Sequence, residues 1–283
     1  ERHATVERVR TALTTGWQTA ENSRERLTVA DEREHVLFFL VEVIYEVIPA
    51  FYEEIEAALA RVFGAAPDEL RVPEMLHFGS WVGGDMDGHP DVHAKTIRES
   101  CHRHHQLIVN RYFQEVQALA EKLSQSESRV HVSPQLNSRI EAYRSLVSGA
   151  RASVPASHDR MPYRVFLGQV AERLRATYEG RSGQYDRVGQ LIEDLQLVEQ
   201  SLAANRGREA GMFHVRRMLR RVRTFGFHLA TLDVRQHALM HREIVGSAFG
   251  DPDWVRRSAL ERTERLGRAL AADESPFEDL TPA

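Results

Sequence analysis

Apolar side chains recur at helical spacing through most of this chain. Between residues 28 and 63 they follow each other every three or four positions, through Ile44, Val47 and Ile48. That spacing places them on one face of a helix and predicts one long helix or two. Pro49 interrupts the stretch and is expected to kink or divide it.

The start of this predicted helix carries polar residues that suit a helix amino terminus. Asp31 and Glu34 form a capping-box pattern there. The most apolar part, residues 36–51, contains Glu42 and Glu46 and is too short and too charged to span a bilayer. It is therefore expected to be a buried helix, and no membrane partner is expected.

Helical spacing continues along the rest of the chain, with polar segments between the helices. Residues 149–162, rich in Ser, Ala and Pro, are expected to form a flexible loop, and the acidic tail at 273–283 to be frayed. The further helices are predicted near residues 97–123, 136–148, 163–179, 188–204 and 209–223.

Two short segments break the helical pattern and predict strands. One is the apolar run at residues 76–82. The other lies within 225–234, where Phe225, Phe227 and Leu229 alternate with other residues. Because strands that alternate with helices form parallel sheets, both strands are expected in one parallel sheet.

The first strand runs directly into an unusual stretch, "HFGSWVGGDMDGHPDV" at residues 77–92. Gly83 and Gly84 suit either a turn with positive φ or a close approach of backbone to a ligand. Asp85 and Asp87 suit either an Asx-turn or the rim of an active site, since barrel enzymes place their catalytic polar groups at the carboxyl ends of parallel strands. Both interpretations stay open on these residues alone.

A calcium loop is the third interpretation of this stretch, and the sequence argues against it. Aligned to a twelve-residue calcium loop, the stretch puts Gly83 at the first position and Ala94 at the last, where carboxylates are required. Pro90 also stiffens the loop.

The second strand is followed by "LDVRQHALMH" at residues 232–241. Asp233, Arg235, Gln236 and His241 bring together an acid, a guanidinium, an amide and an imidazole. Such a set can hold a phosphorylated or carboxylated small molecule and move a proton.

Two other clusters have competing interpretations. Cys101 and His105 lie four apart, which allows a metal pair, but surface or half-buried histidines on a helix are favoured. A stretch near the end of the last predicted helix is expected to carry one basic face opposite Met218, Leu219 and Val222. That face is either solvated or binds an anion or acidic partner. Its arginines are at positions 216, 217, 220, 221 and 223.

Composition narrows the class of protein. The chain has 283 residues, a mass of 32.3 kDa, a formal net charge of −4 and a pI near 6.4. Nothing in this balance indicates a nucleic-acid partner. Cys101 is the only cysteine, which excludes an internal disulfide and is typical of a reducing, cytoplasmic location.

Four blocks of the chain, in order, resemble phosphoenolpyruvate carboxylases. They are "GWQTAE", "DEREHVLFFLVEVIYEVIPAFY", "FGSWVGGDMDGHPDV" and "RRVRTFGFHLATLDVRQHALMH". The resemblance implies a mostly helical fragment of a TIM-type (β/α)₈ barrel enzyme, with two short strands near 76–82 and 225–234. Residues 1–283 would form a single partial domain from the early-middle part of the enzyme, because the family's catalytic-histidine motif and metal-binding carboxylates are absent.

The resemblance also implies an activity. The full-length parent would add bicarbonate to phosphoenolpyruvate, giving oxaloacetate and phosphate, with Mg²⁺ or Mn²⁺ held by residues outside this chain and as a cytoplasmic homotetramer. The catalytic residues carried over are Asp85, Asp87, Arg235 and His241, and the substrate-binding residues are Gly83, Gly84, Asp233 and Gln236; no metal ligand is carried over.

Two positions depart from the family pattern. Met86 and Met240 stand where the family usually carries arginines, and methionine cannot bind an anion by charge. The alternative is therefore a non-catalytic helical scaffold, a pseudoenzyme that has lost the phosphate clamp. An enzyme of similar fold that acts on another phosphorylated acid is a third hypothesis.

Overall fold

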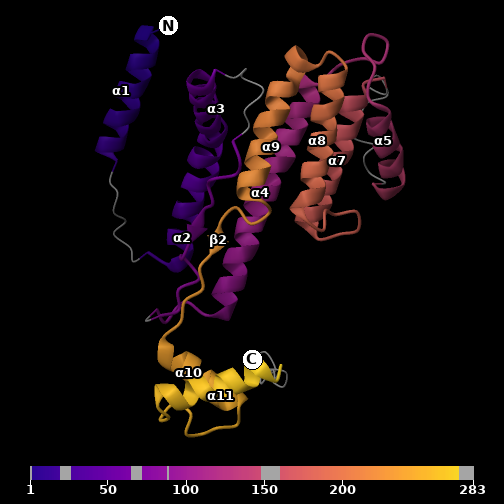
Figure 1. Cartoon of the computed structure of the whole chain (residues 1–283). Coiled ribbons are helices and arrows are strands. Elements are labelled where there is room, and N and C mark those ends of the chain that lie inside the picture. The colour runs from indigo at the N-terminus through magenta and orange to yellow at the C-terminus, as the bar shows by residue number, and fades with distance from the viewer. Residues whose placement is uncertain (1, 20–26, 65–71, 88, 148–159, 274–283) are drawn as a thin grey trace.

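The computed structural model describes residues 2–19, 27–64, 72–87, 89–147 and 160–273. Most of the chain forms a layer of long helices, and a short two-stranded sheet lies beside this layer (Figure 1). The second strand leads to the last two helices, which lie below the layer in Figure 1. The helices are α1 Arg2–Gln18, α2 Val29–Phe38, α3 Tyr45–Phe63, α4 Ala94–Lys122, α5 Pro134–Leu146, α7 Pro162–Glu179, α8 Val188–Ala204, α9 Phe213–Phe225, α10 Ala238–Ala248 and α11 Ala259–Ala271.

The predicted helices between residues 28 and 223 are confirmed, with their ends shifted by a few residues. The expected loop at 149–162 lies outside the described residues except for its last three, and Pro162 already begins α7. Nearly all of the expected frayed tail at 273–283 also lies outside them. Strands β1 and β2 are much shorter than the helices and cover Gly79–Ser80 and Thr231–Leu232.

The amino terminus of α2 is capped one turn earlier than the sequence pattern predicted. Thr28 is the N-cap residue: its hydroxyl accepts from the backbone N–H of Asp31 at 3.2 Å, and the Asp31 carboxylate accepts from the backbone N–H of Thr28 at 2.9 Å. The pairing of Asp31 with Glu34 was therefore wrong. The Glu34 carboxylate instead pairs with Arg103 on α4 at 2.7 Å.

Pro49 does not divide the helix, because two features accommodate it. A π-helical turn at Phe39–Ile44 joins α2 to α3, and the helix then continues past Pro49 to Phe63. Proline leaves the carbonyl four residues earlier, that of Tyr45, without its helical donor. Arg221 of α9 takes that carbonyl instead, donating from Nε at 3.0 Å.

One face of this helix is buried in the core. Val29–Phe63 has the length and composition of a membrane-spanning helix, with a mean hydropathy of 1.6 over its most apolar window. The expectation that this stretch is too short and too charged to span a bilayer was therefore wrong. Leu37, Leu40, Tyr45 and Tyr52 are packed against the rest of the protein, so the expected burial holds for one face. The opposite face leaves other apolar residues exposed.

The main core forms where α4 packs along α7 and against α9, and α8 packs against α9 (Figure 1). The apolar stripe predicted for α4 supplies Ile108, Tyr112 and Val116, none of which has any solvent exposure. Burial of such side chains stabilises a domain by roughly 1.5–3 kcal/mol each, which accounts for the dominance of helix packing here.

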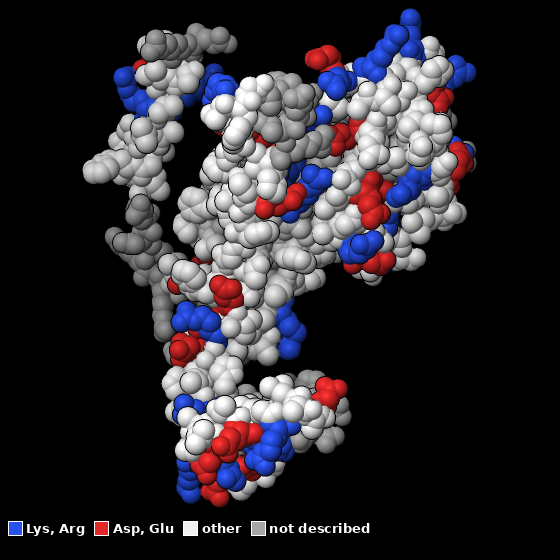
Figure 2. Space-filling view, viewed as in Figure 1, with Lys and Arg blue, Asp and Glu red and all other residues white. Residues whose placement is uncertain are grey.

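The arginines of α9 do not form one basic face, which corrects the sequence interpretation. Met218, Leu219 and Val222 are buried as expected, but the arginines point toward several different segments of the chain. All five engage glutamates from other parts of the chain, so they are neither a freely solvated face nor a vacant anion site. Figure 2 likewise shows basic and acidic side chains next to each other over the helical layer. The pairs are Arg216–Glu199 at 2.9 Å, Arg217–Glu53 at 2.8 Å, Arg220–Glu56 at 2.9 Å, Arg221–Glu46 at 2.7 Å, Arg221–Glu115 at 2.5 Å and Arg223–Glu74 at 3.6 Å.

Candidate active-site rim

Strands β1 and β2 pair in parallel, as the sequence predicted. Gly79 lies opposite Thr231 and Ser80 opposite Leu232. The Thr231 N–H donates to the carbonyl of Phe78 at 2.8 Å, and the Asp233 N–H to that of Ser80 at 2.9 Å. Both strands are shorter than expected. Of the predicted 76–82 only Gly79–Ser80 is a strand; Phe225 still belongs to α9, and residues 226–230 form a turn before β2.

The two segments stay paired beyond the strands, along the predicted rims. The Arg235 N–H donates to the carbonyl of Gly84 at 3.1 Å, and the Met86 N–H donates back to the carbonyl of Arg235 at 2.8 Å. Because both segments leave the carboxyl ends of parallel strands, the side chains of Asp85 and Arg235 emerge next to each other. An Arg235 nitrogen lies 3.3 Å from an Asp85 carboxylate oxygen.

Gly83 and Gly84 are required by packing. Gly83 has a φ of +84°, and a Cβ there would also lie 3.2 Å from the Cβ of Ser100 and closer still to its hydroxyl. A Cβ on Gly84 would overlap the carbonyl oxygen of Asp233 and lie 3.0 Å from Leu232. Close backbone approach is thus the reason for the second glycine. Their assignment to substrate binding stays a prediction.

Asp85 combines the two roles that the sequence left open. Its carboxylate accepts from the backbone N–H of Asp87 at 3.1 Å, which is the Asx-turn of the plain-turn interpretation. The same carboxylate faces Arg235 across the rim. The side chain of Arg235 is 62% exposed, and the pair with Asp85 leaves further guanidinium donors available for a ligand.

The side chains of the other predicted site residues do not take part in this pair. The Gln236 amide oxygen accepts from the neighbouring His237 N–H at 2.7 Å. The exposed side chains of Asp87, Asp233 and His241 make no hydrogen bond or ion pair with another described residue. His241 is on α10, which begins at Ala238 after the rim. The structure therefore joins Gly84, Asp85 and Arg235 and does not join His241 to them.

Two histidines of α4, which the sequence interpretation did not place at the site, hold the turn before β2. His104 is 2% exposed, and its Nδ1–H donates to the carbonyl of Ala230 at 3.4 Å. His105 donates in the same way to Phe227 at 3.0 Å. Burial lowers the pKa of His104, so its ring is neutral at pH 7.

The metal interpretation of Cys101 and His105 is not supported. Cys101 is exposed, and His105 uses its Nδ1 for the turn. The described residues hold no group of three or more His, Cys, Asp or Glu side chains placed to bind a metal ion. The rim carboxylates Asp85 and Asp87 thus do not fit a divalent cation by themselves.

Polar groups gathered where parallel strands end are the arrangement by which α/β enzymes build their active sites. Residues 1–276 match the family model described as "Phosphoenolpyruvate carboxylase". The chain belongs to the phosphoenolpyruvate carboxylase family.

Curated relatives with the name phosphoenolpyruvate carboxylase agree with this assignment. The protein of Xanthomonas euvesicatoria pv. vesicatoria (strain 85-10) is 46% identical over 274 residues, covering 97% of this chain and 30% of the relative. That of Nitrosomonas europaea is 33% identical over 300 residues, covering 97% and 31%. That of Roseiflexus castenholzii is 30% identical over 282 residues, covering 93% and 30%. The chain thus spans about a third of the length of these relatives.

Proposed function

We propose that the full-length protein containing this chain is a phosphoenolpyruvate carboxylase, which adds bicarbonate to phosphoenolpyruvate and releases oxaloacetate and phosphate. The observation that carries the proposal is the rim itself. Asp85 and Arg235, 150 positions apart in the chain, face each other at the ends of two parallel strands in a chain of this family. This chain alone is proposed to be inactive.

The exposed guanidinium of Arg235 is proposed to bind a substrate anion or to organise the charges around it. Arginine suits that task because its planar fork matches carboxylate and phosphate oxygens. Asp85 forms an ion pair with Arg235 and fixes its position. Its carboxylate also accepts from the Asp87 N–H, which stabilises the conformation of the loop. Asp87 is proposed to position neighbouring arginines, and His241 to donate a hydrogen bond to a residue that contacts the substrate; both roles await partners beyond the described residues. Gly83, Gly84, Asp233 and Gln236 shape the pocket.

The remainder of the site is proposed to come from outside this chain. The two parallel strands would be part of a (β/α)₈ barrel closed by later strands. Ligands for a divalent cation, Mg²⁺ or Mn²⁺, would also lie there, where the cation would stabilise enolate charge. The assembled enzyme is proposed to be a cytoplasmic homotetramer, without nucleic-acid or membrane partners.

Met86 and Met240 are what the pseudoenzyme hypothesis rests on. Met86 is half-buried within the rim, and Met240 lies exposed on α10. Nothing in the comparisons favours loss of activity, so the carboxylase remains the proposed function.

An assay that couples oxaloacetate to its reduction tests the proposal on the full-length protein and on this chain separately. The full-length protein is expected to form oxaloacetate only when bicarbonate and a divalent cation are present, and the chain alone to form none. Turnover by the 283-residue chain would overturn the proposed division of the site. Phosphate release without bicarbonate dependence would identify a different reaction.

A further inference from the structure

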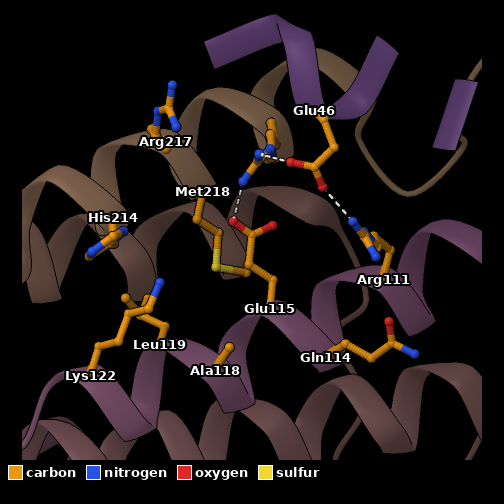
Figure 3. A pocket seen from close by; sticks show the side chains of 11 residues that line it. Glu46, Arg111, Gln114, Glu115, Ala118, Leu119, Lys122, His214, Arg217 and Met218 are labelled. Atoms are coloured by element: carbon orange, nitrogen blue, oxygen red, sulfur yellow. Dashed lines mark hydrogen bonds and ion pairs between the residues drawn. The ribbon is translucent and has the colours of Figure 1, made fainter. Parts of the chain in front are cut away.

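A groove separate from the rim runs between α4 and α9 and is closed at one end by Glu46 of α3 (Figure 3). We call it the α4–α9 groove, and its volume is about 410 Å³. Ligand sites of small molecules begin at roughly 300 Å³. Ala118 is exposed at its middle, and Leu119 and Met218 lie buried beneath it, so the groove has a small apolar surface between polar ends.

The closed end of the groove is fully neutralised by ion pairs. Glu46 pairs with both Arg111 and Arg221, and Arg221 reaches Glu115 at 2.5 Å (Figure 3). The Tyr45 hydroxyl donates to Glu115 as well. Both carboxylates that line the groove are therefore committed to neighbours within the protein.

The open end carries one cation that is not committed, Lys122. Beside it lies His214, whose pKa is lowered by burial and by the charges of Lys122 and Arg217. Lys122 and His214 project next to each other (Figure 3), and neither has a hydrogen bond or ion pair with another described residue. Arg217 nearby is held by Glu53 at 2.8 and 3.0 Å. The groove is lined by four permanent cations and two carboxylates, and Glu53 balances the charge of Arg217. The charge of Lys122 is therefore left unbalanced, which favours an anion.

We propose that the α4–α9 groove binds a small organic oxyanion, a carboxylate or phosphate ester with a short apolar body. The oxyanion lies between Lys122 Nζ and the His214 ring, and the body lies against the exposed Ala118. Gln114, eight residues before Lys122 on α4, lies about 12 Å farther along at the helical rise per residue, which limits the ligand to one or two rings in length. Its exposed amide can bond a polar group at the far end of that body.

Calorimetry on the full-length protein, with benzoate and phenyl phosphate as probes, tests the proposal. At least one probe is expected to bind with a Kd below about 1 mM, and inorganic phosphate, which lacks the body, roughly tenfold more weakly. Lys122→Gln and His214→Gln are each expected to weaken binding by about tenfold. The probe that binds more tightly tells whether the oxyanion is a carboxylate or a phosphate ester.

The chain offers a matched control for the lysine. Lys95 is the only other lysine and lies at the opposite end of the same helix, so Lys95→Gln is expected to leave the affinity unchanged. Arg235→Gln, which removes a cation from the rim, is also expected to leave it unchanged and separates this site from substrate binding. Thermal unfolding of the exposed Lys122→Gln variant should match the wild type.

Two results would overturn the proposal. One is the absence of binding by either probe up to about 10 mM, where only very weak affinities remain. The other is equal affinity in the wild type and in both groove variants. The experiment measures binding and not turnover, so its result does not depend on whether the full-length protein is an active carboxylase.

Discussion

Arg221 of α9 donates from Nε to the main-chain carbonyl of Tyr45, at 3.0 Å. This is the carbonyl that Pro49 leaves without its helical donor. The same guanidinium pairs with Glu46 and Glu115, and its side chain is only 9% exposed. One arginine thus replaces a missing helical hydrogen bond and joins α3, α4 and α9.

Replacing Arg221 is therefore expected to destabilise the protein strongly. Arg221→Met leaves the Tyr45 carbonyl without its donor and removes one partner each from Glu46 and Glu115. Loss of one partner from a largely buried pair such as Arg221–Glu115 costs about 3–5 kcal/mol. Urea unfolding measures the change. Arg223→Gln is the control, because Arg223 has only a 3.6 Å pair with Glu74, and it is expected to cost about 0–1 kcal/mol. Equal effects of the two substitutions would contradict the role given to Arg221.

A methyl group on Gly84 is expected to force the two rims apart. Gly84→Ala places a Cβ against the Asp233 carbonyl oxygen, and overpacking of this kind costs about 1–3 kcal/mol. Gly267→Ala is the control: Gly267 is inside α11 with open space around it, and alanine there is expected to stabilise by about 0.5–1 kcal/mol. Thermal unfolding of both variants checks the pair, and a neutral Gly84→Ala would show that the strand ends are not in close contact.

Asp85 allows function and stability to be separated. Asp85→Asn keeps an acceptor for the Asp87 N–H but removes the charge that faces Arg235. Since the pair is largely exposed, stability is expected to fall by about 0–1 kcal/mol. Carboxylation by the full-length protein is expected to fall by about tenfold or more, since misplaced charged groups weaken transition-state stabilisation. A variant with unchanged kinetics would remove Asp85 from the site.

His104 is expected to make stability depend on pH. Burial, followed by the charge of Arg33, lowers its pKa in the folded protein, while nearby Glu34 and hydrogen bonds to the backbone oppose the shift. A lowered folded pKa means that the stabilisation is present above the unfolded value of 6.5 and is lost as pH falls toward the folded value. The free energy of unfolding of wild type and of His104→Gln is compared from about pH 7.5 to 5.5, and the difference between them measures how His104 makes stability depend on pH. A constant difference across that range would contradict it.

The helices were predictable because each buries one stripe at a local, regular spacing. The stripe of Ile108, Tyr112 and Val116 on α4 depends only on the period of the helix. The second strand was predicted too long for a related reason. Phe225, Phe227 and Leu229 alternate in sequence, but Phe225 ends α9 and Leu229 is a buried turn residue with a φ of +63°. Buried apolar residues at a helix end and in the following turn thus produced the alternating pattern that is typical of a strand.

Contacts between distant segments could not be predicted from local pattern. The partners of the α9 arginines include Glu53 and Glu56, each 164 positions away, so a helical wheel could not distinguish a solvated face from a set of ion pairs. At the rim, strand order predicted that Asp85 and Arg235 belong to one edge. It could not tell that these two meet while His241, on its own helix, does not.

Bicarbonate-dependent formation of oxaloacetate from phosphoenolpyruvate by the full-length protein tests the central claim most directly. The account predicts such turnover in the wild type and a large loss in Arg235→Gln, with normal folding of both proteins. A folded full-length protein that forms no oxaloacetate with bicarbonate and either Mg²⁺ or Mn²⁺ present would contradict the account and favour the non-catalytic scaffold.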